Sequence, residues 1–219
     1  MPEWWTYAPS DFLLFSARTW YRQVALHNAD VWPVQVGAIA TGVLLLALVA
    51  CQKDPRGRLL ATGLAAAWSV VGYAFHLQRH AQINWAAPWF AYACFAQAVV
   101  LVVAAFLGSG LALRRPVRAG DRIAFAVAAL AIVAYPAIAL VAGRGVAAAE
   151  AFGTMPDPTA IASVALLSLS QAGRRHVVLT IPLAMCAIAS LFLQVLGAPE
   201  WPLPLAAAIV ALTAGRPAR

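Results

Sequence analysis

The sequence predicts an all-α protein: a polytopic transmembrane bundle of about seven helices, preceded by an interfacial amphipathic helix. Of the 219 residues, 63% are hydrophobic and 11% are charged, whereas soluble domains carry about 45–50% apolar and about 25% charged residues. The apolar residues form long runs without charge, which is the pattern of membrane spans. The basic residues lie in short clusters between those runs, as cytoplasmic loops require.

The N-terminal segment, residues 1–29, is expected to lie at the membrane interface, and residues 30–219 to form the bundle. Ser10 or Asp11 supplies a helix cap. A charged helix of this length cannot span a membrane, but it can lie flat with its apolar face in the headgroup boundary. The residues that share the apolar face by their spacing are Leu13, Ala17, Trp20 and Val24.

Seven apolar segments follow. They are Val31–Cys51, Leu59–His76, Trp85–Leu113, Ile123–Ala142, Thr159–Ala172, Val177–Leu196 and Pro202–Ala214. Pro136 is expected to kink the fourth segment. The fifth and seventh are shorter than the roughly 17 residues usually needed to cross, so six crossings, with one segment re-entrant, is the alternative.

The distribution of charge predicts the orientation in the membrane. Eleven of the fifteen Lys and Arg residues lie in the loops of one side, and the basic side of a membrane protein faces the cytoplasm. This places the N-terminus outside and the C-terminus inside, in the inner (plasma) membrane. Six of the eight acidic residues and seven of the eight Trp residues are expected on the outer side. The outer side is therefore the chemically more varied one, and the cytoplasmic side consists of basic loops.

Several short motifs resemble an uncharacterised family of small bacterial multi-pass membrane proteins. The motifs are Glu3-Trp4-Trp5-Thr6-Tyr7, Pro9 through Ser16, Arg18-Thr19, Asn28 through Pro33, and Ile83-Asn84-Trp85-Ala86-Ala87. The resemblance extends over the whole chain. It implies a multi-pass membrane protein, and it implies no activity because the family is a domain of unknown function.

The stretch His76–Trp89 concentrates polar side chains at the outer edge of the bundle. A polar stripe along the second span should face other helices or a water-filled cavity, because contact with lipid is costly. Its members are Thr62, Ser69, Tyr73, His76 and His80. The candidate ligand-binding residues are His76, Arg79, His80, Asn84, Trp85 and Gln97. Alternatively, Arg79 extends to the interface and Gln97 joins two helices.

A metal site is a second interpretation of the same region. His76 and His80 are four residues apart, a spacing compatible with two metal ligands. His27 and Asp30 are expected at the same depth and would complete the site. The alternatives are hydrogen-bonded His residues at the membrane edge and a site for an organic ligand. No cofactor is indicated.

Two classes of function remain after the motifs are considered. Lys53 is the only lysine, so no intramembrane Schiff base is available, and HExxH, GxSxG and phosphate-binding glycine motifs are absent; an enzyme is disfavoured. The acidic residues are expected in loops or the N-terminal segment, so a carboxylate proton relay in the membrane is not expected. Nucleic-acid binding is also excluded.

The favoured class is a small transporter, channel-like or ligand-binding protein with a site at the outer leaflet. The other class is an accessory or assembly subunit of a larger membrane complex. The expected partners are membrane lipids and either further copies of the chain or a larger complex. The three Cys residues are far apart and predict packing, not disulfides.

Overall fold

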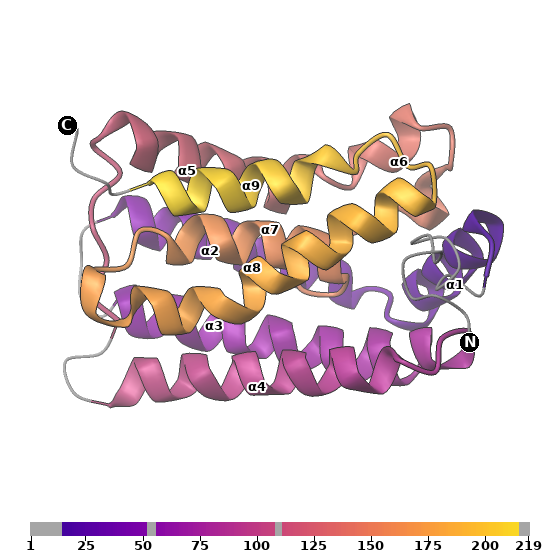
Figure 1. Cartoon of the computed structure of the whole chain (residues 1–219), viewed down its shortest axis with the longest axis horizontal. Coiled ribbons are helices and arrows are strands. Elements are labelled where there is room, and N and C mark those ends of the chain that lie inside the picture. The colour runs from indigo at the N-terminus through magenta and orange to yellow at the C-terminus, as the bar shows by residue number, and fades with distance from the viewer. Residues whose placement is uncertain (1–14, 52–55, 108–110, 215–219) are drawn as a thin grey trace, which may run out of the picture.

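The computed structural model describes residues 15–51, 56–107 and 111–214. Within these ranges the chain is helical apart from its connections, and its only β-pairing is an isolated bridge between Leu113 and Ser170. Figure 1 shows the helices side by side along the long axis, with α1 at one end of the bundle and the C-terminal end of α9 at the other. The all-α fold class is confirmed.

Each of the seven predicted apolar segments contains a helix. The elements are α1 (Ala17–Asp30), α2 (Val34–Ala50), α3 (Arg56–Val70) with the π-helix η3 (Val71–Leu77), the 3-10 turn η4 (His80–Gln82), α4 (Ala87–Phe106), α5 (Ala119–Ala129) with the π-helix η5 (Leu130–Ala134), α6 (Ala137–Val141), the 3-10 turn η6 (Val146–Ala148), α7 (Pro156–Leu167), α8 (Ala172–Val195) and α9 (Pro202–Thr213). The helix break predicted at Pro136 lies between η5 and α6. In Figure 1, α8, which contains Pro182, bends near its middle.

Seven membrane crossings are not confirmed. Among the described residues, three helices are long and apolar enough to cross a membrane: Gly57–Gln82, Ala87–Phe106 and Arg175–Val195. A fourth crossing results if α1 and α2, which meet at an angle of 88°, form one broken span.

Helix α7 is surrounded by other helices, which explains why the fifth predicted segment is shorter than a membrane span. Every one of its 12 residues is buried, and α8, α9, α5 and η5 pack around it. Such a helix is about 18 Å long, well short of a hydrocarbon layer of about 30 Å. A helix covered by protein on all sides does not need to match the bilayer.

Both ends of α7 have their backbone groups satisfied in the interior. Pro156 and Pro158 occupy the first turn, where a peptide N–H would have no partner within the helix. At the other end, the Arg114 guanidinium donates to the carbonyls of Ser168 (2.8 Å) and Ser170 (2.7 Å). These bonds satisfy carbonyls that a helix end leaves unpaired.

Helix α1 lies across the end of the bundle. Its cap is Ser16, whose side chain accepts from the Thr19 N–H at 3.2 Å; the predicted start at Ser10 or Asp11 lies outside the described residues. Trp20 and Val24 from the predicted apolar face are buried, and Trp20 packs against Phe75 and Phe192. That part of the face therefore contacts protein.

The predicted polar stripe on the second span is wrong. Thr62 is exposed, and Tyr73 is exposed as well, whereas His76 and His80 are buried. The cause is the π-helix η3, in which each i→i+5 turn holds an extra residue. The insertion rotates the following side chains by about 100° relative to a continuous α-helix, so the α-helical spacing does not hold across it.

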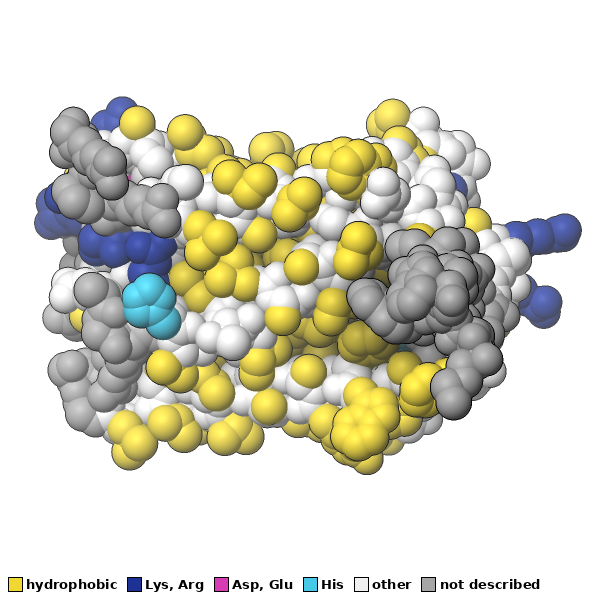
Figure 2. Space-filling model, in the orientation of Figure 1, with side chains coloured by type: hydrophobic (Ala, Val, Ile, Leu, Met, Phe, Trp, Pro, Cys, Tyr) yellow, Lys and Arg dark blue, Asp and Glu magenta, His cyan; other side chains and the backbone are white. Residues whose placement is uncertain are grey.

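The surface has an apolar middle and charged ends. In Figure 2, yellow hydrophobic side chains cover the middle of the visible face, and dark blue Lys and Arg side chains gather at its two ends. Exposed apolar residues include Val99, Phe106, Leu130, Ile188 and Leu191. This is the surface expected of a protein whose middle is solvated by lipid.

Candidate functional site

Three neighbouring side chains at the α1 end form a hydrogen-bonded chain. The Nδ1 atoms of His76, in η3, and His80, in η4, are 3.1 Å apart. His80 Nε2 lies 3.0 Å from the amide nitrogen of Asn84. The amide oxygen of Asn84 accepts from the Ala86 N–H at 2.9 Å. The short η3–η4 segment thus folds its polar side chains back on one another.

The Ala86 N–H, at the end of this series of hydrogen bonds, determines which atom donates and which accepts in each bond. The Ala86 N–H can only donate, so it fixes the amide of Asn84 with its oxygen toward Ala86 and its NH₂ toward His80. His80 Nε2 must therefore accept, and its proton must be on Nδ1. That proton is donated to His76 Nδ1, which leaves the proton of the neutral His76 ring on Nε2.

The resulting His76 N–H has no hydrogen-bond partner among the described residues. His76 is only 3% exposed, and a buried donor without a partner costs about 1–3 kcal/mol. Such a group calls for an explanation other than packing. It lies on a residue that lines a pocket.

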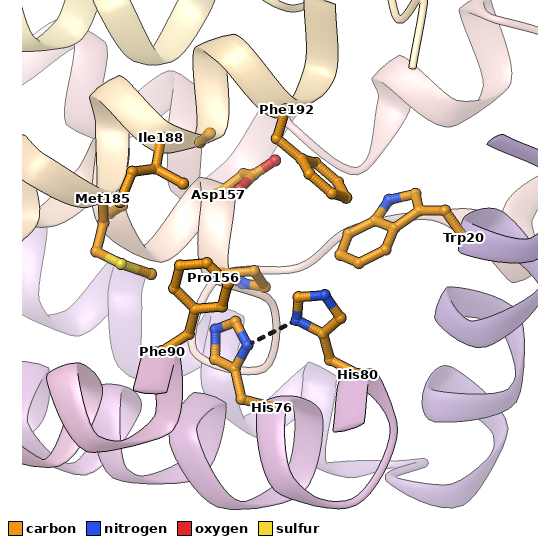
Figure 3. A pocket seen from close by; sticks show the side chains of 11 residues that line it. Trp20, His76, His80, Phe90, Pro156, Asp157, Met185, Ile188 and Phe192 are labelled. Carbon is orange, nitrogen blue, oxygen red and sulfur yellow. Dashed lines mark hydrogen bonds between the residues drawn. The ribbon is translucent and has the colours of Figure 1, made fainter. Parts of the chain in front are cut away.

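The pocket lies between α1, η3, α4, α7 and α8, and Figure 3 shows its side chains. Trp20, Phe90 and Phe192 form aromatic walls, and Met185 and Ile188 add apolar ones. The remaining lining residues include His76, His80 and Asp157. The cavity measures about 40 Å³, and one water molecule needs about 10–15 Å³ by this measure, so it holds no more than a few water molecules or a very small ligand.

Ring packing holds the His pair in place. His80 stacks on Phe90 with the ring centroids 5.8 Å apart, and Trp20 meets His80 edge-on at 5.3 Å. Trp20 also contacts Phe192 at 4.6 Å. The site therefore depends on α1, whose Trp20 covers the pocket from the end of the bundle.

The structure brings three of the six predicted ligand-binding residues together: His76, His80 and Asn84. The other three lie elsewhere. Arg79 forms an ion pair with Asp30. Trp85 is 75% exposed on the surface. Gln97 donates to the Val178 carbonyl of α8 at 3.0 Å, which is a contact between two helices.

The side chains predicted to bind a metal make other contacts. His27 donates from Nε2 to the Thr154 carbonyl at 3.1 Å, and Asp30 pairs with Arg79. His76 and His80 turn their Nδ1 atoms toward each other. In the part of the chain that the structure describes, no group of three or more His, Cys, Asp or Glu residues is placed to hold a metal ion.

Three buried carboxyl groups at the same end were missed by the sequence analysis, which expected its acidic residues in loops. Glu150 precedes α7, Asp157 is in the first turn of α7, and Glu200 precedes α9; all three are buried. Their burial could have been suspected from the mostly apolar residues beside Glu150, Val146–Ala149 and Ala151–Met155. A residue in a loop is therefore not necessarily exposed to solvent.

Arg144 is the cation closest to these carboxyls. Its guanidinium lies 2.5 Å from Glu200 Oε1, donates to the Tyr21 hydroxyl and stacks over the Tyr21 ring at 4.4 Å. Arg144 therefore ties α1 to the connections that precede α7 and α9.

Comparison with known proteins identifies one relationship. The profile of a family of unknown function, DUF6064, matches residues 17–217. The opening motif that carried part of the resemblance lies before this match. No match was found among curated proteins or among solved structures.

Proposed function

We propose that this chain, which belongs to DUF6064, a family of unknown function, is an integral membrane protein. It binds a small molecule in the pocket at the α1 end of its bundle. The observation that carries this proposal is the buried His76 N–H, which the chain from Asn84 through His80 orients and which has no protein partner. A ligand with a hydrogen-bond acceptor would supply the missing partner.

The membrane location is supported by the helices and by the surface. Three helices, or four with the bent pair, are long and apolar enough to cross, and the exposed middle of the visible face is apolar (Figure 2). Many Val, Leu and Ile side chains are exposed, and soluble monomeric proteins rarely expose large continuous apolar surfaces. Lipid is the solvent that suits this surface.

The pocket indicates the chemical class of the ligand. Its walls are aromatic and aliphatic, so the body of the ligand is apolar, and the His76 N–H selects an acceptor atom such as a carbonyl oxygen. The cavity measures only about 40 Å³, and the His76 Nε2 atom is covered in it. Contact of a ligand with this atom therefore requires a wall side chain such as Trp20 or Phe192 to move.

The exposed aromatic residues do not favour the accessory-subunit alternative. Trp85, Trp89 and Tyr92 are exposed near the α1 end, where they would contact a partner subunit. The same residue types gather at membrane interfaces, so lipid headgroups account for them equally well. Ligand binding is the function that a specific unpartnered group supports.

The orientation is proposed with the N-terminus outside and the C-terminus in the cytoplasm of the cell, because described parts of the basic segments, at Gly120 and Arg175, lie beside the C-terminal end of α9. A reporter that is active only in the cytoplasm, fused after Arg219, is expected to be active, and a reporter that requires export, fused at the same position, to be inactive. The reverse result would contradict the orientation.

The pocket is tested by NMR of protein labelled with ¹⁵N-histidine in lipid nanodiscs, using acetone and 2-methylpropene as probes. The two molecules have nearly the same shape, but only acetone accepts a hydrogen bond. We expect His80 to carry its proton on Nδ1 and His76 on Nε2. Acetone is then expected to shift the His76 Nε2–H resonance several-fold more than 2-methylpropene does.

Two variants control this experiment. In His76→Phe the probes are followed through the His80 resonances, which both are expected to shift equally, whereas His176→Phe, which changes an exposed His in α8, should preserve the difference at His76. Equal shifts from both probes in the wild-type protein would contradict recognition through the His76 N–H. A proton on His76 Nδ1 would contradict the deduced hydrogen-bond chain.

A further inference from the structure

The carboxyl groups at the α1 end outnumber the cations that face them. Glu150, Asp157 and Glu200 are buried, and Arg144 pairs with Glu200. Both oxygens of Glu150 and Oδ2 of Asp157 lack a hydrogen-bond partner in the described part of the chain. One guanidinium therefore serves three carboxyls, and two acidic groups are left without a counter-charge.

An unpaired ionised carboxylate is unstable in such a place. Removing one charged group from water costs several kcal/mol even after the protein relaxes, and a buried group usually neutralises instead. Glu150 lies in a connection outside the helices. Its burial, with Asp157 and Glu200 nearby, raises the pKa of Glu150 well above its usual value.

We propose that Glu150, Asp157 and Glu200 form a proton-binding site, and that Asp157 couples this site to the ligand pocket. The proposal corrects the expectation that the acidic residues take no part in proton transfer. Its first half depends only on the buried carboxyls. Its second half, the coupling, rests on the proposed function, because it requires a ligand in the pocket.

The three carboxyls have different surroundings and hence different roles. Glu200 is paired with Arg144, 2.5 Å away. Asp157 occupies the first turn of α7, where the helix N-terminus stabilises negative charge, while burial and the nearby Glu200 raise the pKa of Asp157 to about 7. Glu150 has neither kind of support, so it holds the proton in the resting protein.

Asp157 belongs to both sites. It lines the ligand pocket together with His76, whose buried N–H also lacks a partner, and Figure 3 shows both side chains on the wall of this pocket. A proton that moves between Glu150 and Asp157 changes the charge on the pocket wall. A ligand that prefers one charge state therefore binds together with proton uptake or release, as a proton-coupled transporter requires.

Titratable and charged groups from several neighbouring elements surround the carboxyls. They are Tyr21 of α1, Tyr135 after η5, Arg144 after α6, and Cys186 of α8 beside Asp157. Tyr135 is buried and its hydroxyl has no hydrogen-bond partner among the described residues, so it is available as a neutral donor.

Infrared spectroscopy of the full chain in nanodiscs tests the first half directly. The wild-type protein is expected to show, near neutral pH, the C=O stretching band of a protonated carboxylic acid, with a shift in D₂O. Glu150→Gln, which is nearly isosteric with protonated Glu, is expected to remove the part of this band that Glu150 contributes, and Glu150→Gln combined with Asp157→Asn is expected to remove the band entirely, because burial raises the pKa of Asp157 to about 7. The control is Asp30→Asn, since Asp30 is exposed and paired with Arg79, and it should leave the band unchanged.

Stability measurements give a second readout. A carboxyl whose pKa is raised by folding binds its proton more tightly in the native state, so the free energy of unfolding decreases as pH rises from about 4.3, the ordinary value for Glu, through the raised value. Glu150→Gln is expected to flatten this decrease and to be more stable than the wild type at alkaline pH.

The coupling is measured on His76 without a ligand. The ¹⁵N shift of His76 Nε2 is expected to follow pH with the same midpoint as the infrared band, and Asp157→Asn should abolish this dependence. Absence of the band, or its full persistence in the Glu150→Gln/Asp157→Asn double variant, would overturn the proton site. A pH-independent His76 shift would overturn the coupling. Either result can occur while acetone still binds, which separates it from failure of the proposed function.

Discussion

Replacing Arg144 by Met is expected to destabilise the folded protein by about 3–5 kcal/mol at neutral pH. The guanidinium is the only cation paired with a buried carboxyl at the α1 end of the described structure. Its removal leaves Glu200 buried, without its cation and close to two further carboxyls. It also removes the hydrogen bond and the stacking contact that join Tyr21 of α1 to the connection after α6.

Two further variants separate the charge effect from the loss of packing. Arg144→Met combined with Glu200→Gln is expected to recover most of the lost stability, because no unpaired charge then remains. Arg22→Met changes an exposed cation on α1 and should alter stability by less than about 0.5 kcal/mol. Unfolding by denaturant titration in mixed micelles measures all three. If Arg144→Met were as stable as Arg22→Met, the carboxyls would not need this cation.

Replacing Trp20 by Ala is expected to destabilise the protein by about 3–5 kcal/mol and to loosen α1 from the bundle. Trp20 is 3% exposed, and its ring contacts Phe75, His80 and Phe192. Deleting it leaves a cavity where the pocket meets α1. Hydrogen exchange in α1 should increase together with the loss of global stability.

The matched control for Trp20 is a second tryptophan near the same end of the bundle. Trp89→Ala in α4 removes a side chain that is 67% exposed, so we expect a change in stability below about 1 kcal/mol. Equal effects of the two substitutions in the same denaturant titration would show that Trp20 does not hold α1 in place.

Several features could be predicted from residue patterns because they depend on local composition. Each of the seven apolar segments contains a helix, and the break at Pro136 follows from the missing N–H and the bulk of the ring. His76, His80 and Asn84 were identified as candidates through their polarity at a span edge, and they lie in one hydrogen-bonded chain. Each of these inferences needs only neighbours in sequence.

Other features required information from distant parts of the chain. Arg79 and Trp85 were chosen by their proximity in sequence to the His pair, but one pairs with Asp30 and the other is exposed. The polar stripe failed because α-helical spacing was applied across a π-helix. A local change of register of this kind has no clear mark in the residue pattern, and only the tertiary structure identifies α4 as the neighbour with which η3 makes its contacts.

The amino-acid sequence alone determined that the chain is helical and apolar, and it located the polar edge that holds the His pair. Burial of Glu150, Asp157 and Glu200 was decided only by the tertiary structure, which folds the connections before α7 and α9 over the end of the bundle. The tertiary structure also placed the 12-residue α7 in the centre, where it is covered by protein. The physical reason is that hydropathy describes the preference of a residue for water or an apolar environment. The environment of a loop or a short helix is set by the distant parts of the chain that pack against it.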